Sequence, residues 1–177
     1  LSVEALKLPE TYYPLTVKLC IKCWLVQTED YADPGELFSS SYAYFSSTSA
    51  SWLNHASSYA GMITRKLSLN PSSFIIEIAS NDGYLLKNFV SQGIPCMGIE
   101  PTENTARKAE SIGVETRREF FCEKLGQELA IEGMQADLLV GNNVYAHVPD
   151  INDFTKGLKA ALKPSGTVTL EFPHLMR

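Results

Sequence analysis

Residues 74–86, FIIEIASNDGYLL, decide the fold of this chain. An apolar strand runs into a short turn with one glycine, Gly83, and a helix is expected to begin directly after it. A nucleotide-binding fold carries its glycine-rich turn at this place. Here an acid, Glu77, also lies inside the strand. The question is therefore which ligand an acidic turn with a single glycine can hold.

The composition is that of an ordinary folded domain. The chain has 177 residues, 45% hydrophobic and 20% charged, enough to bury a core but short for two full domains. Its net charge of −5 and the lack of a long basic stretch make nucleic acid an unexpected partner. No apolar run reaches the length of a membrane span, and no signal peptide is apparent. We expect a cytoplasmic protein, and the lack of an initiator methionine indicates a trimmed or partial chain.

Strands alternate with amphipathic helices through most of the chain. Strands are expected at 74–79, 95–100, 114–117, 136–141 and 167–172, and helices at 51–68, 84–92, 102–112, 122–132 and from 151 onward, with a turn at 163–166. Such alternation predicts an α/β domain, a doubly wound parallel sheet over residues 51–177. Residues 1–50 form a small N-terminal lobe in this prediction. The ligand should bind at the carboxyl ends of the strands, near the switch point.

The turn chemistry favours a cation over a pyrophosphate. A dinucleotide site needs further glycines to bring the backbone close to the phosphates, and bulky residues follow Gly83. Carboxylates at Asp82 and Glu77 would repel phosphate and attract positive charge. S-adenosylmethionine carries a ribose, an amino group and a sulfonium but no phosphate, so it suits this turn. Glu100, at the end of the next strand, is placed to accept both ribose hydroxyls.

Polar residues also follow the fourth strand. Asn142 and Asn143 come directly after it and can orient a ligand without adding charge, and His147 lies beyond them. Simpler explanations remain open at this point: Glu77 and Glu100 as acids at strand ends, an N-cap role for the turn aspartate, and a solvated loop histidine.

Several motifs together resemble a known family. The segments EIASNDGYLL, GIEP, ADLLVGNNVYAHVPDINDF and LEFPHL resemble the S-adenosylmethionine-dependent C-methyltransferases that act on nucleotide-linked ketosugars, among them deoxysugar tailoring enzymes. The upstream YPLTVKLCIKCWLVQ and YAYFSS resemble the zinc-binding region of that family. The resemblance covers nearly the whole chain. It implies a zinc-binding lobe, a methyltransferase core and a C-terminal Rossmann-like domain.

The resemblance also implies roles for particular residues. The expected cofactor-binding residues are Glu77, Ala79, Ser80, Asn81, Asp82, Gly83, Glu100, Pro101, Asn142 and Asn143. His147 and Tyr42 are the expected catalytic residues, both in contact with the sugar. In the complete enzyme a base would remove the proton beside a ketone, and the resulting carbanion would attack the sulfonium methyl group.

The chain departs from the family at both ends. Structural zinc needs four ligands, whereas only the Cys20/Cys23 pair is present, so a half site is expected in this chain and a full zinc site in the longer parent. Cys96 and Cys122, like the first pair, are expected to be thiols or metal ligands and not to form disulfides. The family continues into a Tyr-His-Glu-His segment, one of whose histidines is thought to be the base. We therefore expect a fragment that binds cofactor without that base, with His147 the one in-chain candidate.

Two other consequences and two rival functions follow. An uncovered strand edge at 167–172 would favour self-association. The expected partner is otherwise a small-molecule substrate, a nucleotide-linked sugar, with neither nucleic acid nor membrane involved. The rivals are a nicotinamide-dependent oxidoreductase on the same fold class and a non-catalytic cofactor-binding module. The missing glycines argue against the first, while the truncation makes the second reasonable.

Overall fold

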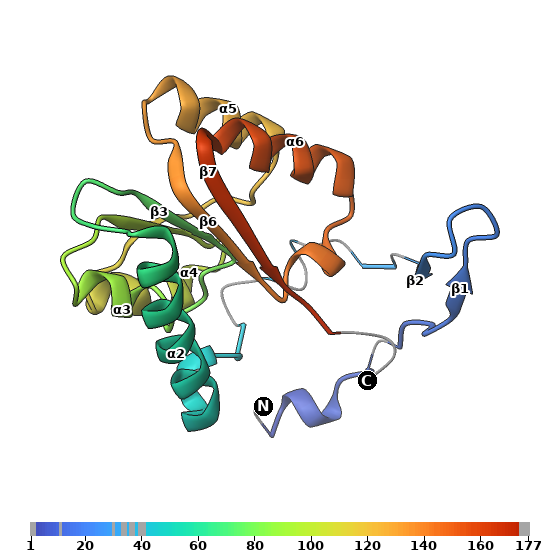
Figure 1. The fold of residues 1–177 in the computed structure, drawn as a ribbon. Helices are drawn as coiled ribbons and strands as arrows, with labels where there is room; N and C mark the ends of the chain where they lie inside the picture. The colour runs from blue at the N-terminus through green and yellow to red at the C-terminus, as the bar shows by residue number, and fades with distance from the viewer. Residues whose placement is uncertain are drawn as a thin grey trace. The chain divides into compact units, whose positions relative to one another are not determined.

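A computed structural model describes residues 3–10, 12–29, 31, 32, 35, 38 and 42–173. The chain forms two compact units, residues 1–37 and 38–177. The first unit contains the short helix η1 (Ala5–Lys7) and an antiparallel hairpin of β1 (Val17–Leu19) and β2 (Val26–Thr28) (Figure 1). The sequence pattern placed residues 38–50 in the N-terminal lobe, whereas their contacts assign them to the second unit.

The second unit is built on one parallel sheet of five strands. These are β3 (Ile75–Ile78), β4 (Cys96–Ile99), β5 (Glu115–Arg117), β6 (Ala136–Asn142) and β7 (Leu162–Glu171). Their order is β5-β4-β3-β6-β7. The chain builds the sheet outward from β3 to β5, then returns to the middle and adds β6 and β7 on the other side of β3, so the switch in strand order lies between β3 and β6. The predicted doubly wound sheet is confirmed, and its switch point lies where a ligand is expected.

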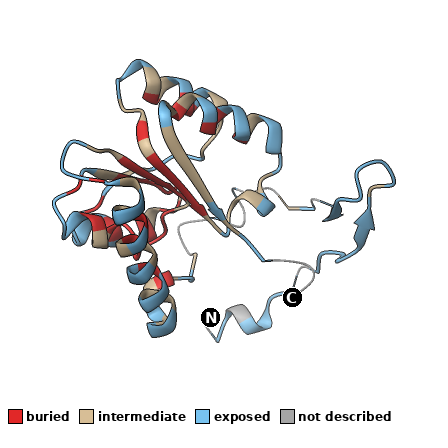
Figure 2. Cartoon of the chain, in the orientation of Figure 1, coloured by how far each residue is buried: buried red, intermediate tan, exposed pale blue. Residues whose placement is uncertain are grey.

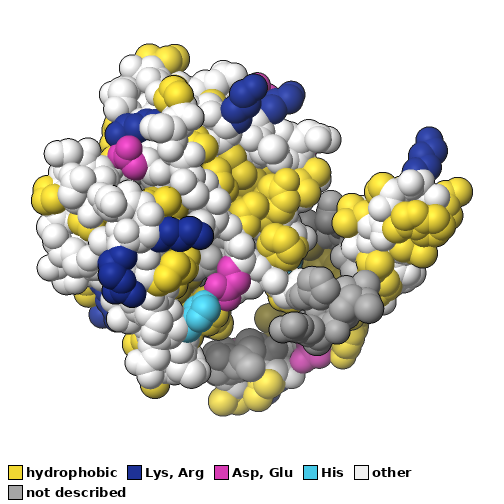
Figure 3. All heavy atoms as spheres, viewed as in Figure 1, with side chains coloured by type: hydrophobic (Ala, Val, Ile, Leu, Met, Phe, Trp, Pro, Cys, Tyr) yellow, Lys and Arg dark blue, Asp and Glu magenta, His cyan; other side chains and the backbone are white. Residues whose placement is uncertain are grey.

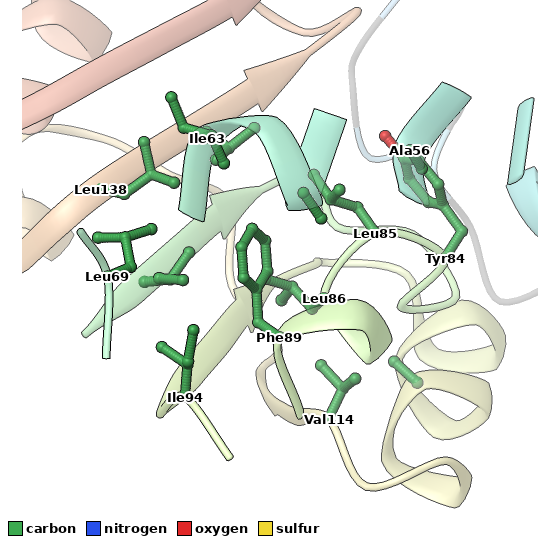
Figure 4. Packing of buried hydrophobic residues seen from close by; sticks show 14 residues of the cluster. Ala56, Ile63, Leu69, Tyr84, Leu85, Leu86, Phe89, Ile94, Val114 and Leu138 are labelled. Carbon is green, nitrogen blue, oxygen red and sulfur yellow. The ribbon is translucent and has the colours of Figure 1, made fainter. Parts of the chain in front are cut away.

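Helices cover both faces of this sheet (Figure 1). They are η2 (Ser46–Thr48), α2 (Ala50–Leu67), α3 (Lys87–Val90), α4 (Glu103–Ser111), α5 (Glu123–Ile131), η3 (Tyr145–His147) and α6 (Ile151–Ala161). One core joins α2, α3 and α4 to the sheet, with Ile63, Phe89 and Leu138 among its buried residues (Figure 4). A second core joins α5 and α6 to the other face. Figure 2 shows the buried residues on these inner faces. None of the described helices is long and apolar enough to cross a membrane.

Two helix details differ from the sequence prediction. The helix expected at 84–92 is confined to α3, because the turn before it occupies the first residues, and Val90, expected to be buried, is 36% exposed. Thr102 precedes α4 as expected, but its side chain makes no capping hydrogen bond. Asp150, by contrast, caps α6, because its side chain accepts the N–H groups of Asn152 and Asp153.

The predicted turn at 163–166 is wrong, because these residues lie inside β7 at a register shift. Leu162 pairs with Ala136 and Thr167 pairs with Leu138, so the β7 segment between them is longer than the β6 segment it faces. Gly166 fits this irregular stretch, since an added Cβ would lie 2.7 Å from the Ala136 carbonyl oxygen. The Lys-Pro-Ser-Gly pattern therefore marks a bulge in the strand.

Candidate functional site

The turn after β3 has an unusual backbone. Ala79, Asn81 and Gly83 have φ angles of 56°, 50° and 77°. A positive φ is uncommon for residues other than glycine and persists when the surroundings fix it, often at functional sites. At Gly83 an added Cβ would lie 3.1 Å from a Val114 methyl and 3.2 Å from Ala109, so glycine is needed there for space as well as for φ. The turn is thus a constrained element at the carboxyl end of β3.

Residues 44–48, which we call the strap, lie across this turn. The Ser46 N–H donates to Asn81 Oδ1 at 2.9 Å, and the Ser47 N–H donates to Asp82 Oδ2 at 3.1 Å. The turn side chains are therefore held by backbone groups from far upstream. The sequence pattern gave no indication of this contact, because nothing in either segment predicts which backbone amide the turn will meet.

Glu100 organises the same turn from the end of β4. Its Oε2 accepts the Asn81 N–H and its Oε1 accepts the Thr102 N–H, both at 2.9 Å. The residue is only 4% exposed. Each carboxylate oxygen can accept further hydrogen bonds, so the expected contact with ribose stays a prediction. The structure adds a second role that the sequence did not reveal: the carboxylate fixes the backbone on both sides of the site.

The other two acids of the site are buried and incompletely paired. Among the described residues, neither oxygen of Glu77 nor Oδ1 of Asp82 has a hydrogen-bond partner. Burial raises the pKa of Glu77 well above its ordinary value, and the charges of Glu100 and Asp82 add to this. The nearby Tyr84 hydroxyl partly offsets this rise in the pKa of Glu77, although it forms no hydrogen bond with the carboxyl group. Buried acceptors without donors fit a ligand that brings a cation or N–H groups.

Not every predicted turn residue points toward this opening. Ser80 is fully buried, and its hydroxyl lies against β4, where a Cβ added to Gly98 would collide with Ser80 Oγ. Its side chain therefore packs between strands. Pro101 is partly exposed after the end of β4. The placement of Ser80 limits its expected contact with the cofactor to the backbone.

Two of the predicted residues lie where β6 ends, next to the end of its sheet partner β3. Asn142 is partly buried, and its Nδ2 donates to the Tyr84 hydroxyl at 3.2 Å. Asn143 is exposed with a φ of 52°, and its N–H donates to the Glu171 carbonyl oxygen at 2.6 Å. His147 is exposed in η3. The structure thus brings the two asparagines to the switch point and leaves His147 facing solvent.

Tyr42 lies beside an aromatic cluster that the sequence did not reveal. Its ring is 5.4 Å from that of Phe38, which is 6.2 Å from Phe120. The Asn104 side-chain amide donates to the Tyr42 carbonyl oxygen. Burial raises the pKa of the Tyr42 phenol, and the negative charge of Glu100 raises it further. The predicted substrate residue is therefore close to the acids of the site, next to partly exposed flat rings.

The cysteine pair lies in the first unit, in the turn between β1 and β2. Cys20 is half-buried and Cys23 is exposed. The pKa of the Cys20 thiol is lowered, first by the backbone N–H of Cys23 and then by that of Lys22. This arrangement favours a thiolate, the form that binds metal. Within the described ranges no three potential metal ligands come together, so the pair accounts for two of the four ligands that zinc requires.

Comparison with known proteins adds an independent finding. Residues 76–168 match the family described as "Methyltransferase domain". The chain belongs to this methyltransferase family. Residues 1–38 match a second family, described as "Putative zinc binding domain". The chain is also 32% identical to the C-methyltransferase NovU of Streptomyces niveus over 167 residues, which are 94% of this chain and 40% of NovU. It therefore spans less than half the length of that relative.

Solved structures support the same fold. A SAM-dependent methyltransferase from Anabaena variabilis ATCC 29413 aligns with a TM-score of 0.53 and 18% identity, over 66% of this chain and 50% of that one. The YcgJ protein of Bacillus subtilis aligns with the same TM-score and 15% identity, over 66% and 50% of the two chains. Identities this low establish the fold alone, that of a methyltransferase core.

Proposed function

We propose that this chain is the cofactor-binding part of an S-adenosylmethionine-dependent methyltransferase that methylates a carbon of a nucleotide-linked deoxy-ketosugar. The observation that carries the proposal is a pair of buried acids beside a strained turn: among the described residues, both carboxylate oxygens of Glu77 and Oδ1 of Asp82 lack a hydrogen-bond donor. Membership of the methyltransferase family supports the reaction class. The similarity to a C-methyltransferase supports carbon as the methylated atom.

The residues of the site fit the proposed cofactor. Glu77 and Asp82 offer acceptors to its amino group, and the remaining lone pairs of Glu100 suit ribose hydroxyls. The rings of Phe38 and Phe120 offer a flat apolar surface on which the adenine ring of the cofactor could stack. When bound, the cofactor supplies an electrophilic methyl group. The chain's own residues contribute binding and orientation, which can account for much of such a rate enhancement.

The acceptor would lie on the β6 and β7 side of the site. Asn142 and Asn143 flank the switch point there, and His147 faces the solvent from which a substrate arrives. Tyr42 would reach the acceptor from the opposite side, with its phenol kept protonated by its raised pKa. A protonated phenol can donate a hydrogen bond to a carbonyl oxygen as negative charge develops on it. This is the role we propose for Tyr42.

Calorimetry with S-adenosylhomocysteine tests the cofactor assignment directly. We expect saturable one-to-one binding to this chain, and weak or undetectable binding of NAD. Equal or tighter binding of NAD would contradict the proposal and favour an oxidoreductase. Binding of S-adenosylhomocysteine, together with no methyl transfer from S-adenosylmethionine to any nucleotide-linked ketosugar, would instead favour a cofactor-binding module.

Zinc binding is proposed for the longer protein that contains this sequence. The lowered pKa of the Cys20 thiol and the presence of Cys23 in the same turn support two of the ligands, and the match of residues 1–38 supports the assignment of this lobe. We expect little stoichiometric zinc in the chain alone and one zinc per full-length chain, measured by elemental analysis. One tightly bound zinc per copy of the present chain would disprove the half-site interpretation.

A further inference from the structure

Asn81 is expected from the sequence to bind the cofactor, but both polar atoms of its side chain contact the strap. Asn81 Oδ1 accepts the Ser46 N–H at 2.9 Å, and Nδ2 donates to the Tyr44 carbonyl oxygen at 3.2 Å. The residue is 8% exposed, and its own N–H donates to Glu100. The Asn81 amide therefore holds the backbone of a distant segment at two places.

The backbone conformation of Asn81 fits the same role. Its φ of 50° lies in the left-handed region, which asparagine and aspartate adopt more readily than most residues. Aspartate would bring acceptors alone, so the Tyr44 carbonyl oxygen would lose its donor, whereas the asparagine amide supplies a donor and an acceptor. Asparagine therefore meets both requirements of this position, the conformation and the two contacts.

A second asparagine holds the chain directly upstream of the strap. Asn104, in the first turn of α4, donates from its side-chain amide to the Tyr42 carbonyl oxygen. Glu100 accepts the N–H groups of both Asn81 and Thr102. One buried carboxylate thus fixes the two elements that carry the asparagines, the turn after β3 and the start of α4.

The downstream end of the strap is fixed by α2. Ser49 follows the strap and caps this helix, because its hydroxyl accepts the Trp52 N–H at 3.3 Å. The helix packs on the sheet and also contacts the end of β7, where His55 Nε2 lies 2.8 Å from Glu171 Oε2. Figure 3 shows a histidine side chain against an acidic one on the visible surface. The strap therefore runs between a fixed helix and the two asparagines.

Tyr42 is the side chain that this arrangement places. It lies two residues before the strap, and its ring is 5.4 Å from that of Phe38. Burial, and next the charge of Glu100, raise the pKa of its phenol. The phenol is thus close to the carboxylate that fixes both asparagines. Its place depends on the backbone at Tyr42, which Asn104 and the strap hold.

We propose that Asn81 and Asn104 are positioning residues for Tyr42, because they hold the strap and the backbone before it so that the phenol stays beside the acids of the site. The inference rests on the proposed function, in which this phenol donates a hydrogen bond to the carbonyl oxygen of the acceptor. Asn81 then serves the acceptor through Tyr42, whereas Glu77 serves the cofactor. The ligand class on the strap side is a ketone.

Amide exchange separates a strap anchor from a cofactor ligand. Asn81→Gly removes the side chain and suits the positive φ. NMR should show the Ser46 N–H exchanging about 2- to 10-fold faster, as expected for the loss of one hydrogen bond, while calorimetry shows a nearly unchanged affinity for S-adenosylhomocysteine. Asn143→Gly, the same change at a φ of 52°, is the matched control for Ser46 exchange. Unaltered Ser46 exchange in Asn81→Gly, or a large loss of affinity, would overturn the proposal.

The Tyr42 phenol gives a readout that a structural role elsewhere would not move. With 3-fluorotyrosine at Tyr42, fluorine NMR follows its titration in this chain. Asn81→Gly and Asn104→Ala should each lower the pKa of the phenol toward its ordinary value, because the ring leaves its partly buried place beside Glu100. Asn104→Ala keeps the test decisive if Asn81→Gly fails to fold. A titration that neither variant shifts would overturn the proposal.

Acceptor binding connects this arrangement to the reaction. With S-adenosylhomocysteine present, Asn81→Gly and Asn104→Ala should weaken the binding of thymidine diphosphate-4-keto-6-deoxyglucose, and adding Tyr42→Phe should weaken it little further. Fully additive losses would show that the asparagines act independently of Tyr42 and would overturn the proposal. If the unaltered chain does not bind this ketosugar, the proposed substrate class is wrong, whereas the Ser46 exchange and the Tyr42 titration still decide the positioning role.

Discussion

The carboxyl ends of β3 and β4 differ from those of β6 and β7. At the first pair, Glu77 and Glu100 are buried, and both oxygens of Glu100 hold backbone N–H groups. At the second pair, His55 and Glu171 are paired but half-exposed, and His147 faces solvent. The first region is part of the core, whereas the second is a surface. If the first region is the proposed cofactor site, its geometry is fixed by folding, whereas the exposed side chains of the second region can change without disturbing the core.

Replacing Glu100 should have the largest effect, because it affects folding and binding together. Glu100→Ala leaves the Asn81 and Thr102 N–H groups buried without acceptors, at about 1–3 kcal/mol each. We expect the free energy of unfolding to fall by roughly 3 kcal/mol and cofactor affinity to fall by roughly 1.5–3 kcal/mol. Urea unfolding and calorimetry measure the two separately. Glu115→Ala, at an exposed position, is the control, and an unchanged unfolding curve for Glu100→Ala would contradict its structural role.

Replacing Glu77 should separate stability from binding. Its folded pKa is raised by burial, so the folded chain keeps a proton that the unfolded chain loses above a pH of about 4.3. Stability should therefore decline as the pH rises from the unfolded pKa toward the folded one. Glu77→Gln should remove this decline and raise stability at neutral pH, while weakening cofactor binding by roughly 1.5–3 kcal/mol. Unfolding curves from pH 4 to 8 check the first effect; a pH slope equal to that of the unaltered chain would disprove it.

A third prediction concerns Asp137, a carboxylate near the start of β6 and so away from the carboxyl ends of the strands compared above. Burial alone would raise its pKa, but the Lys163 ammonium and the Phe74 N–H, each 2.7 Å away, hold the pKa below its ordinary value. This stabilisation is present above the unfolded pKa and is lost as the pH falls through the lower folded pKa. Asp137→Asn should cost about 1 kcal/mol at neutral pH and leave cofactor affinity unchanged. A lower affinity would show that the two regions are coupled.

The smallest expected effect concerns the edge of the sheet. β7 is the last strand of the described sheet, and Leu170 on it is 36% exposed. An open strand edge can pair with another chain, and a charged residue discourages such pairing. We predict weak self-association of this chain, reduced by Leu170→Lys without loss of cofactor binding. Light scattering over a range of concentrations measures this self-association, and a monomer at every concentration would contradict the prediction.

The sequence predicted the sheet and the turn because both depend on local pattern. Alternating strands and helices leave a periodic signal, and Glu100 is recognisable as an acid directly after a strand. The strap and the His55–Glu171 pair leave no such signal, because their partners are 35 and 116 residues apart in the chain. The bulge in β7 was mistaken for a turn, since proline and glycine accompany both. Contacts between distant segments are decided by packing, which a single sequence does not display.

The strap has a consequence for how relatives of this chain diverge. Asn81 and Asp82 hold Ser46 and Ser47 through backbone N–H groups, which every residue except proline possesses. The anchor therefore does not depend on the identity of the strap's own side chains. Side chains there can be substituted while the segment keeps its course over the turn after β3. The strap can therefore change the surface that it presents while the attachment that holds it in place is kept.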